Sequence, residues 1–372
     1  MNKLTLQNIT HRYFGSEKDT VNSLTATFVS GLNCIFGLAE SGKSTLTKLI
    51  CGIEKYQGEI LFNDELISSD FKEKDISALL WDFGLRKHKS GRYNLVYPLK
   101  IRKVSDSDIK DSFDNITRFF SVGGAILENT PYHLSNTQKA RLALARAFIR
   151  DSKIKIFDNP FNGLPSSDRR ELFDLFVKAC SLYPDSVIIY ATDDLDEACS
   201  MNQNLLFISD GYKLAEGDPE ILKKQPPHLD VVKSFYPYGS LYSSKILNDK
   251  SIVLEDSDLC ADSRDEKKPL LFDGKSFSFS GNLIDDFYVG KRILAYVTPY
   301  CVTVNNSGVP FRAEGYLQMG RERFVLLKYE NNYLYTVYDE KIRIGDTVKI
   351  TIDSPYLFDM VNERSILNYE KN

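Results

Sequence analysis

The stretch Gly37-Leu38-Ala39-Glu40-Ser41-Gly42-Lys43-Ser44-Thr45 decides the fold of this chain. It matches the pattern G-x-x-x-x-G-K-[ST], and the apolar run 32–36 before it predicts a buried strand leading into a loop and a helix. Glycines let backbone N–H groups wrap a polyphosphate, the Lys43 ammonium neutralises phosphate charge, and the Ser44 hydroxyl can ligate Mg²⁺ at the helix start. The whole stretch, Gly37 to Thr45, is therefore predicted to be a phosphate-binding loop.

Composition bounds the remaining possibilities. The chain has 372 residues, 42% hydrophobic and 26% charged, with a net charge of -4, which is long enough for two domains and too acidic to favour a nucleic-acid partner. Its six cysteines show no C-x-x-C spacing and do not pair with the four histidines, so we expect buried thiols in a reducing cytosol rather than zinc or disulfides. No apolar run reaches the roughly 18 residues of a membrane span, and the N-terminus does not resemble a signal peptide. Membrane association is expected only through a partner.

The chain is predicted to contain two domains, 1–235 and 236–372. The first alternates short apolar runs with helical periods, which indicates an α/β sheet. The second is rich in Tyr, Phe, Val and Thr between turn residues, which indicates a small all-β barrel, with a polar loop at 256–268. Expected strands in the first domain are 24–29, 32–36, 59–63, 154–157, 186–190 and 205–208, and the clearest helices are 135–150 and 168–181.

A second motif lies at 134–147, where the sequence reads LSNTQKARLALARA, and Asp158 then closes the apolar run 154–157. This order resembles the ATP-binding subunits of ABC transporters, whose signature reads LSGGQ-x-x-R-x-x-x-A-R-A. The resemblance implies a P-loop ABC-type ATPase domain with a mixed sheet and a helical subdomain. It also implies that ATP and Mg²⁺ are the cofactors, with Ser44 and Asp158 at the metal.

The resemblance extends along most of the chain. Tyr13 lies where the family places an aromatic ring against adenine, and 82–102 fits the stretch after the family's glutamine loop. Residues 217–235 look like the exit helix of carbohydrate-importer ATPases of the maltose and glycerol-phosphate type, and the tail with Gly290 and 345–350 looks like their C-terminal OB-like (TOBE-type) domain. Such a subunit would serve the import of a sugar or polyol. It would lie peripherally at the cytoplasmic face of the membrane, with two transmembrane permease subunits, a second ATP-binding subunit and, indirectly, an extracellular solute-binding protein.

The chain departs from the family pattern at the positions that carry catalysis. An amide at the general-base position cannot accept a proton from water near neutral pH, so a contribution of about 10²–10⁴-fold should be missing. The departures are Asn159 for the base glutamate, Trp81 for the glutamine, Asp193 for the switch histidine, Asn136 and Thr137 for the signature glycines, and Pro165 for the D-loop aspartate.

The family's architecture decides where these departures act. Two ABC domains close head to tail, so each ATP lies between one subunit's phosphate loop and the other's signature helix, here the segment that begins with Ser135, Asn136, Thr137 and Gln138. Asn159, Trp81 and Asp193 therefore fall on the same site as Lys43. We expect that site to bind Mg-ATP with little or no hydrolysis, and the chain to pair with an intact ATPase subunit. A competent homodimeric ATPase, or a non-transport regulator that uses ATP-dependent dimerisation, remain alternatives.

Several of these residues also have simpler interpretations. Tyr13 is compatible with a surface aromatic beside a strand, Trp81 with a core residue, and Asp158 with a turn residue at a strand end. Ser135 and Gln138 form a capping box whatever the function. Four cationic side chains lie at helical spacing on the signature helix, and a solvated face is the expected explanation for most of them: Lys139, Arg141, Arg146 and Arg150.

Overall fold

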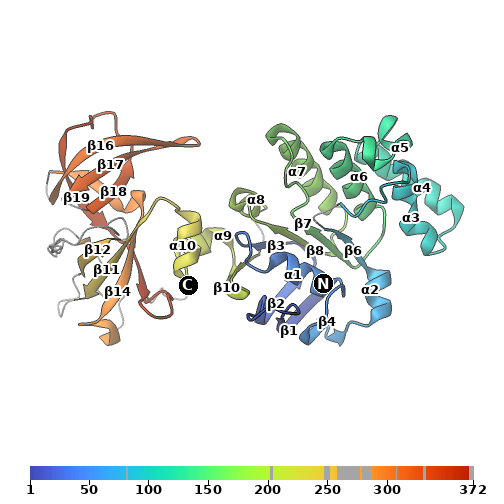
Figure 1. Cartoon of the computed structure of the whole chain (residues 1–372), viewed down its shortest axis with the longest axis horizontal. Helices are drawn as coiled ribbons and strands as arrows, with labels where there is room; N and C mark the ends of the chain where they lie inside the picture. The colour runs from blue at the N-terminus through green and yellow to red at the C-terminus, as the bar shows by residue number, and fades with distance from the viewer. Residues whose placement is uncertain are drawn as a thin grey trace. The chain divides into compact units, whose positions relative to one another are not determined.

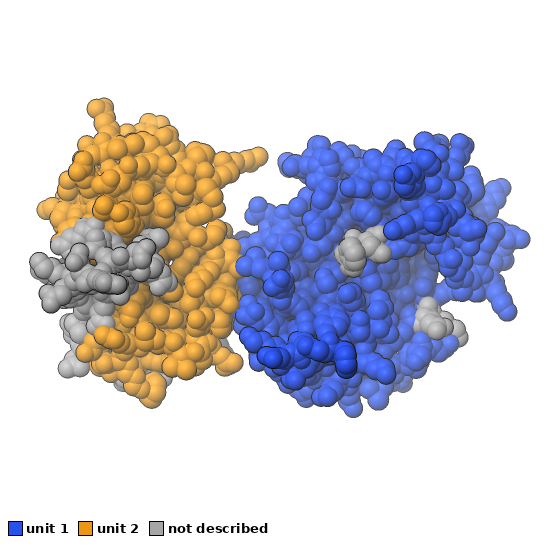
Figure 2. Space-filling view, viewed as in Figure 1, with its two compact units in different colours: residues 1–220 blue, residues 221–372 orange. Residues whose placement is uncertain are grey.

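The computed structural model describes residues 1–80, 83–201, 204–246, 252–257, 277–278, 286–306, 308–329 and 332–367. The chain divides into two compact units, Met1–Glu220 and Ile221–Asn372 (Figures 1 and 2). The sequence predicts a boundary near residue 235, whereas this division falls inside α9 (Pro219–Lys224). The next helix, α10 (Leu229–Phe235), belongs to the second unit because its apolar side chains pack against strands there. No helix in the described ranges is long and apolar enough to cross a membrane.

The centre of the first unit is a mixed sheet with the strand order β10-β9-β3-β8-β7-β6. Strands β9, β3, β8, β7 and β6 run parallel, and β10 pairs antiparallel with β9 at the edge. Every residue of β7 and β8 is buried, as expected for continuous apolar strands covered on both faces. In chain order the strands are β3 (Gly31–Phe36), β6 (Ile76–Leu79), β7 (Ile154–Asp158), β8 (Val187–Thr192), β9 (Leu205–Ser209) and β10 (Tyr212–Gly217).

A second, antiparallel sheet precedes and follows the phosphate loop in sequence. Its order is β2-β1-β4-β5, and its strands are β1 (Lys3–His11), β2 (Val21–Val29), β4 (Gln57–Phe62) and β5 (Glu65–Leu66). In β1 and β2, buried residues mostly alternate with accessible ones, which is the period-2 pattern of strands with one face on a core. That core also includes Leu46, Leu49 and Ile50 of α1 (Lys43–Ile50), so the helix after the loop is anchored by its apolar face.

The remaining helices of the first unit precede, separate and follow β6, β7 and β8 in the chain, and α3, α4 and α5 gather beyond one edge of the central sheet (Figure 1). Ser90, Ser105 and Ser135 each cap the helix that follows, because their hydroxyls accept a hydrogen bond from a backbone N–H in the first turn. In chain order the helices are α2 (Ser69–Asp75), α3 (Gly91–Ile101), α4 (Asp106–Phe119), α5 (Ala125–Glu128), a 3₁₀ turn at Pro131–His133, α6 (Asn136–Phe148), α7 (Ser166–Cys180) and α8 (Leu195–Ser200).

The second unit is all-β, as the sequence predicts, and its strands form two sheets around one core. One sheet has the order β12-β11-β14-β20 and the other β13-β19-β16-β17-β18, with β15 beside β19. The expected loop at 256–268 lies mostly outside the described residues, and its first two residues belong to β12. The strands are β11 (Ser240–Ile246), β12 (Ile252–Ser257), β13 (Phe277–Ser278), β14 (Arg292–Val297), β15 (Val302–Asn305), β16 (Val309–Met319), β17 (Glu322–Tyr329), β18 (Asn332–Val337), β19 (Thr347–Asp353) and β20 (Tyr356–Asp359).

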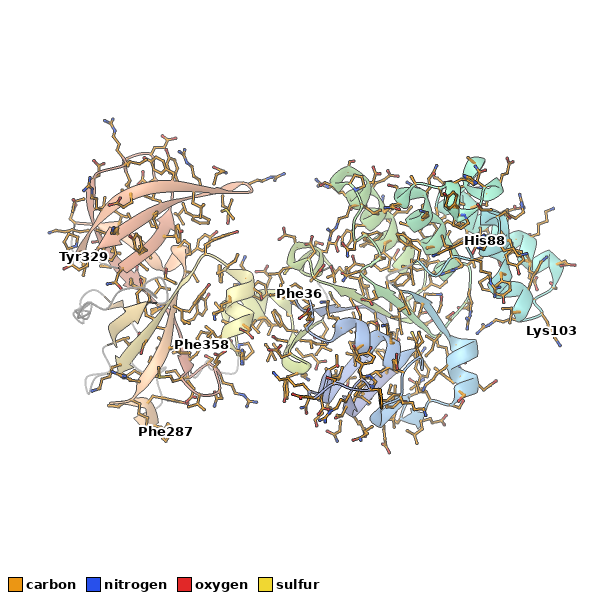
Figure 3. The ribbon with its side chains drawn as sticks, viewed as in Figure 1. Phe36, His88, Lys103, Phe287, Tyr329 and Phe358 are labelled. Carbon is orange, nitrogen blue, oxygen red and sulfur yellow. The ribbon has the colours of Figure 1, made fainter. Side chains whose placement is uncertain are left out.

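Apolar side chains from both sheets fill this second core. Tyr242 of β11, Phe311 of β16 and Ile352 of β19 are fully buried within it. The first unit has its own buried aromatics, among them Phe36 at the end of β3 (Figure 3). Each unit therefore buries the apolar surface that a separate domain requires.

Candidate functional site

The glycines of the phosphate loop are required by close backbone approaches. A Cβ at Gly37 would lie 2.3 Å from the Ile208 carbonyl oxygen, and one at Gly42 would lie 2.6 Å from the Thr20 carbonyl oxygen. Gly42 is also the N-cap of α1 and has φ 100°, a left-handed conformation that side chains disfavour. Neither position can carry a side chain without moving backbone. The loop tip, Leu38, Ala39 and Glu40, is exposed, and Ser44 is half-buried at the helix start.

Lys43 points its ammonium back into the loop. It donates to the carbonyls of Gly37 and Leu38, the latter at 2.8 Å, and to the Ser41 hydroxyl at 3.3 Å. Burial lowers the pKa of Lys43, and the negative charges of Asp193 and then Asp158 oppose that shift. The loop therefore places a buried cation beside two carboxylates.

Asp158 ends β7 and is fully buried, with 0% exposure. Thr47, one helical turn beyond Lys43, donates to its Oδ2 at 3.4 Å, while its Oδ1 has no hydrogen-bond partner among the described residues. Burial raises the pKa of Asp158, and the Ser44 hydroxyl and the Lys43 charge oppose that shift. A buried carboxylate oxygen without a donor is costly unless a cation approaches it, and carboxylate and hydroxyl oxygens are the ligands that Mg²⁺ prefers. The residues present therefore fit a magnesium ion.

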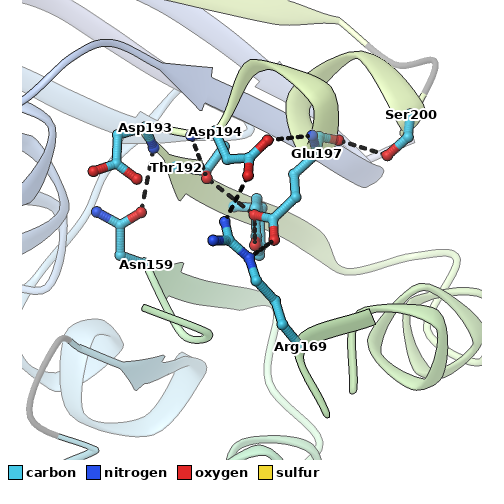
Figure 4. Close-up of polar contacts among 8 residues, drawn as sticks. Asn159, Arg169, Thr192, Asp193, Asp194, Glu197 and Ser200 are labelled. Carbon is cyan, nitrogen blue, oxygen red and sulfur yellow. Dashed lines mark hydrogen bonds and ion pairs between the residues drawn. The ribbon is translucent and has the colours of Figure 1, made fainter. Parts of the chain in front are cut away.

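The order of the parallel strands brings three segments to one edge of the sheet. β8 lies between β3 and β7, and all three run in the same direction. The phosphate loop after β3, Asp193 after β8 and Asn159 after β7 therefore leave the same edge side by side. Asn159 has φ 44°, its N–H donates to the Ala191 carbonyl at 2.8 Å, and its Oδ1 accepts from the Asp193 N–H at 3.3 Å (Figure 4). The Asn159 amide is thereby oriented by the segment that carries Asp193.

Glu197 of α8 fixes that segment through hydrogen bonds with Thr192 and Asp194 (Figure 4). Its carboxylate accepts from Arg169 Nε at 2.6 Å, from the Tyr190 hydroxyl at 2.6 Å and from the Thr192 hydroxyl at 3.0 Å. Arg169 also forms an ion pair with Asp194 at 2.9 Å. Burial, then the Glu197 charge, raises the pKa of Tyr190 well above its ordinary value. Because Thr192 and Asp194 flank Asp193, this network holds Asp193 at the sheet edge.

Tyr13 lies beside the helix that follows the loop. Its hydroxyl is 3.3 Å from the Thr45 hydroxyl, and its ring meets the His11 ring edge to face at 4.5 Å. The two rings help to line an open pocket of about 870 Å³, together with Phe14 and Tyr56. The structure therefore places an aromatic side chain within reach of the phosphate loop, in an open pocket large enough for a nucleobase.

Comparison with known proteins agrees with this geometry. Residues 28–162 match the ABC transporter family model, and these residues span the phosphate loop, the LSNTQ helix and Asp158. The chain contains an ABC transporter domain. Because the match ends at 162, Asp193 and the Glu197 network lie beyond it.

Relatives and solved structures extend the similarity beyond residues 28–162. It is 23% identical over 376 residues to the sn-glycerol-3-phosphate import ATP-binding protein UgpC of Chromobacterium violaceum, covering 98% of this chain and 96% of that protein. It is 31% identical over 199 residues to the protein of the same name in a Ruegeria species, covering 53% and 56% of the two chains. The solved structure of cbiO1 from Clostridium perfringens shares the fold, with a TM-score of 0.53, 23% identity and coverage of 59% of this chain and 90% of that one.

The signature helix of the ABC domain begins with the expected capping box. The Ser135 hydroxyl accepts from the Gln138 N–H at 3.2 Å, and the Gln138 side chain accepts from the Ser135 N–H at 3.0 Å. Asn136 is exposed, and the Thr137 hydroxyl donates to Asp168 of α7 at 2.6 Å. In the described part of the chain, no hydrogen bond joins these four residues to the phosphate loop of the same chain. Their function toward a partner's nucleotide stays a prediction.

The cationic side chains of this helix correct one interpretation. Arg141 is only 13% exposed, donates to the Phe120 carbonyl at 3.0 Å and pairs with Glu171, so a solvated face is the wrong explanation for it. Arg146 donates to the carbonyls of Phe83, at 2.7 Å, and Gly84. The helix therefore holds the segment that follows Trp81. Trp81 itself lies outside the described residues, and its interpretation stays a prediction.

Sequence reasoning missed Thr47 and the group around Glu197. Thr47 lies four residues after Lys43, so helical periodicity alone would place it on the same face. Asp194 is the N-cap of α8 and accepts from the Glu197 N–H at 3.0 Å, a local signal visible in the sequence. Arg169 comes from a different helix and carries no such signal. Pro165 is the N-cap of α7 and offers no side-chain cap.

Proposed function

We propose that this chain is an ATP-binding subunit of an ABC importer for a sugar or polyol, with a nucleotide site that binds Mg-ATP but barely hydrolyses it. The observation that carries the proposal is the pairing of an intact phosphate loop and Asp158 with an amide, Asn159, directly after Asp158. Relatives named for sn-glycerol-3-phosphate import support the importer class and a polyol-phosphate type of solute.

In this proposal Lys43 and the loop N–H groups bind the phosphates, and Ser44 and Asp158 hold Mg²⁺. The metal would neutralise phosphate charge. The orphaned Oδ1 of Asp158 supports this assignment, because a buried oxygen would gain a ligand bond that the protein does not supply. Tyr13 would contact the base, as its proximity to Thr45 allows.

The chain's own residues would orient water without taking its proton. The amide of Asn159 is not a base at neutral pH, and its Oδ1 already accepts from the Asp193 N–H. Asp193 adds a carboxylate rather than an imidazole at the same edge. The general base and the switch histidine are both replaced on one composite site, which favours a heterodimer. In that heterodimer this subunit holds nucleotide, and a partner subunit with an intact base hydrolyses ATP. Two transmembrane permeases, with a solute-binding protein outside, complete the proposed assembly at the cytoplasmic face of the membrane.

Calorimetry with the full chain tests nucleotide binding. Lys43→Ala should weaken Mg-ATP binding by about 1.5–3 kcal/mol, the value of a hydrogen bond to a charged group. Lys178→Ala, at the exposed last turn of α7, removes the same charge and should leave the affinity unchanged. Equal affinity of the wild type and Lys43→Ala would contradict the proposed binding site.

Turnover and co-purification test the pairing. The isolated chain should release almost no phosphate, and a rate near the enzyme median of about 10 s⁻¹ would instead favour the competent homodimer. From native membranes, the chain should purify with permeases and a second ATP-binding subunit. Recovery of an active importer with this chain as its sole ATP-binding subunit would overturn the heterodimer, and recovery without any permease would favour a regulator.

A further inference from the structure

Asp193 is a carboxylate at the sheet edge for which the proposed metal site has no use. Asp193 follows β8, between the phosphate loop and Asn159, and its side chain is exposed. The negative charge of Asp193 raises the pKa of Lys43 more than the negative charge of Asp158 does. Within the described ranges, no hydrogen bond engages its carboxylate, since only its backbone N–H is bonded to Asn159. Its negative charge therefore lies at the same sheet edge as the loop that carries Lys43, and no hydrogen-bond donor among the described residues compensates it.

We propose that Asp193 makes this site bind a nucleoside diphosphate at least as tightly as the triphosphate, so that the subunit keeps a nucleotide whether or not a γ-phosphate is present. This inference rests on the proposed function, because it takes the loop around Lys43 as the phosphate site. It adds Asp193 as a residue that determines nucleotide specificity, and it implies that the subunit also retains a nucleoside diphosphate.

The physical reason is the location of the extra charge. The lysine of this loop pattern reaches the β- and γ-phosphates, so the additional phosphoryl group of a triphosphate adds its charge close to Lys43. Like charges that are only partly screened repel each other, and Asp193 also competes with that group for the Lys43 ammonium. A diphosphate lacks the group and avoids most of this repulsion. Asn159 is neutral and adds no such discrimination.

The network behind Asp193 makes the repulsion hard to relieve. Thr192 and Asp194, its chain neighbours, are held by Glu197 and Arg169 through hydrogen bonds and an ion pair of 3.0 Å or less. The backbone of Asp193 is bonded to Asn159 as well. Only the Asp193 side chain is left to rotate, so the backbone that carries the carboxylate stays at the sheet edge.

Calorimetric titration of the full chain with Mg-ADP and with Mg-ATP tests the inference. We expect the wild type to bind ADP at least as tightly as ATP. Asp193→Asn keeps the size and the backbone bond to Asn159, and should tighten ATP binding about tenfold, or about 1.4 kcal/mol, with ADP changed less than about twofold. Asp196→Asn, an exposed neighbour on α8, removes the same charge away from the loop and should change neither affinity.

Each outcome separates the two proposals. A wild type that prefers ATP tenfold, or an Asp193→Asn variant that shifts both nucleotides equally or neither, would overturn the discrimination while leaving nucleotide binding in place. Asp193→His should tighten ATP binding as Asp193→Asn does if the charge of Asp193 is the cause. If neither variant tightens ATP binding, the failure is not a defect of one substitution, and the proposed discrimination is wrong. Binding of neither nucleotide by the wild type would overturn the proposed function itself, and the inference with it.

Discussion

Removal of the Glu197 carboxylate should destabilise the first unit strongly, although within the described residues no hydrogen bond joins Glu197 to the phosphate loop. The side chain is 11% exposed and accepts from Arg169, Tyr190 and Thr192. In Glu197→Ala the charged hydrogen bond to Arg169 is lost, at about 1.5–3 kcal/mol, and the fully buried Tyr190 hydroxyl loses its acceptor, at about 1–3 kcal/mol. These terms overlap, so we expect about 3–5 kcal/mol in total.

Urea unfolding followed by tryptophan fluorescence suits this test. The chain has a single Trp, Trp81, within residues 1–220, so the signal follows the first unit and not the β-sheet unit. Glu197→Gln keeps an oxygen acceptor of the same size but loses the charge, and should cost about 1.5–3 kcal/mol. Asp196→Ala, one residue earlier and exposed, is the matched control and should stay within about 0.5 kcal/mol.

Two results would refute this reasoning. A loss below about 1 kcal/mol for Glu197→Ala would mean that water replaces the carboxylate at little cost. Equal stability of Glu197→Gln and the wild type would mean that the charge of Glu197 contributes nothing through its ion pair with Arg169. Either result would also remove the argument that this network fixes Asp193.

Two further predictions concern the base position and a buried lysine. Asn159→Glu alone should restore little phosphate release, because Asp193 and Trp81 remain, and a gain of more than about tenfold would show that the amide is the only defect. Lys155 of β7 is fully buried, donates to the Arg150 carbonyl at 2.5 Å and lies 4.4 Å from the Tyr183 ring centre, and burial lowers its pKa to about 8. Between that value and its ordinary 10.5 the unfolded chain binds more protons at this residue, so its contribution to stability rises with pH. Urea unfolding should therefore show that the stability advantage of Lys155→Met shrinks from pH 8 to pH 10, and a constant difference would contradict the lowered pKa.

Sequence reasoning succeeded where a few neighbouring residues decide the structure. The phosphate loop needs glycines at two positions and a lysine at the helix start, and Ser135 with Gln138 caps its own helix, so each pattern is readable within one turn. Apolar runs predict buried strands such as β3 and β7 because both faces of a parallel sheet are covered. The β-rich composition of the tail likewise predicted the all-β class of the second unit.

Tertiary structure decided which of these local elements meet. The order β3-β8-β7 brings Lys43, Asp193 and Asn159 to one edge, although they lie far apart along the chain. Arg169 reaches Glu197 from another helix, and Arg141 lies against Phe120 instead of facing water, because packing and not helical periodicity fixes these pairs. α10 belongs to the second unit because Leu229 and Val232 bury their side chains there. Sequence patterns describe the residues within a turn or a strand, while strand order and long side-chain contacts depend on the free energy of the whole packed domain.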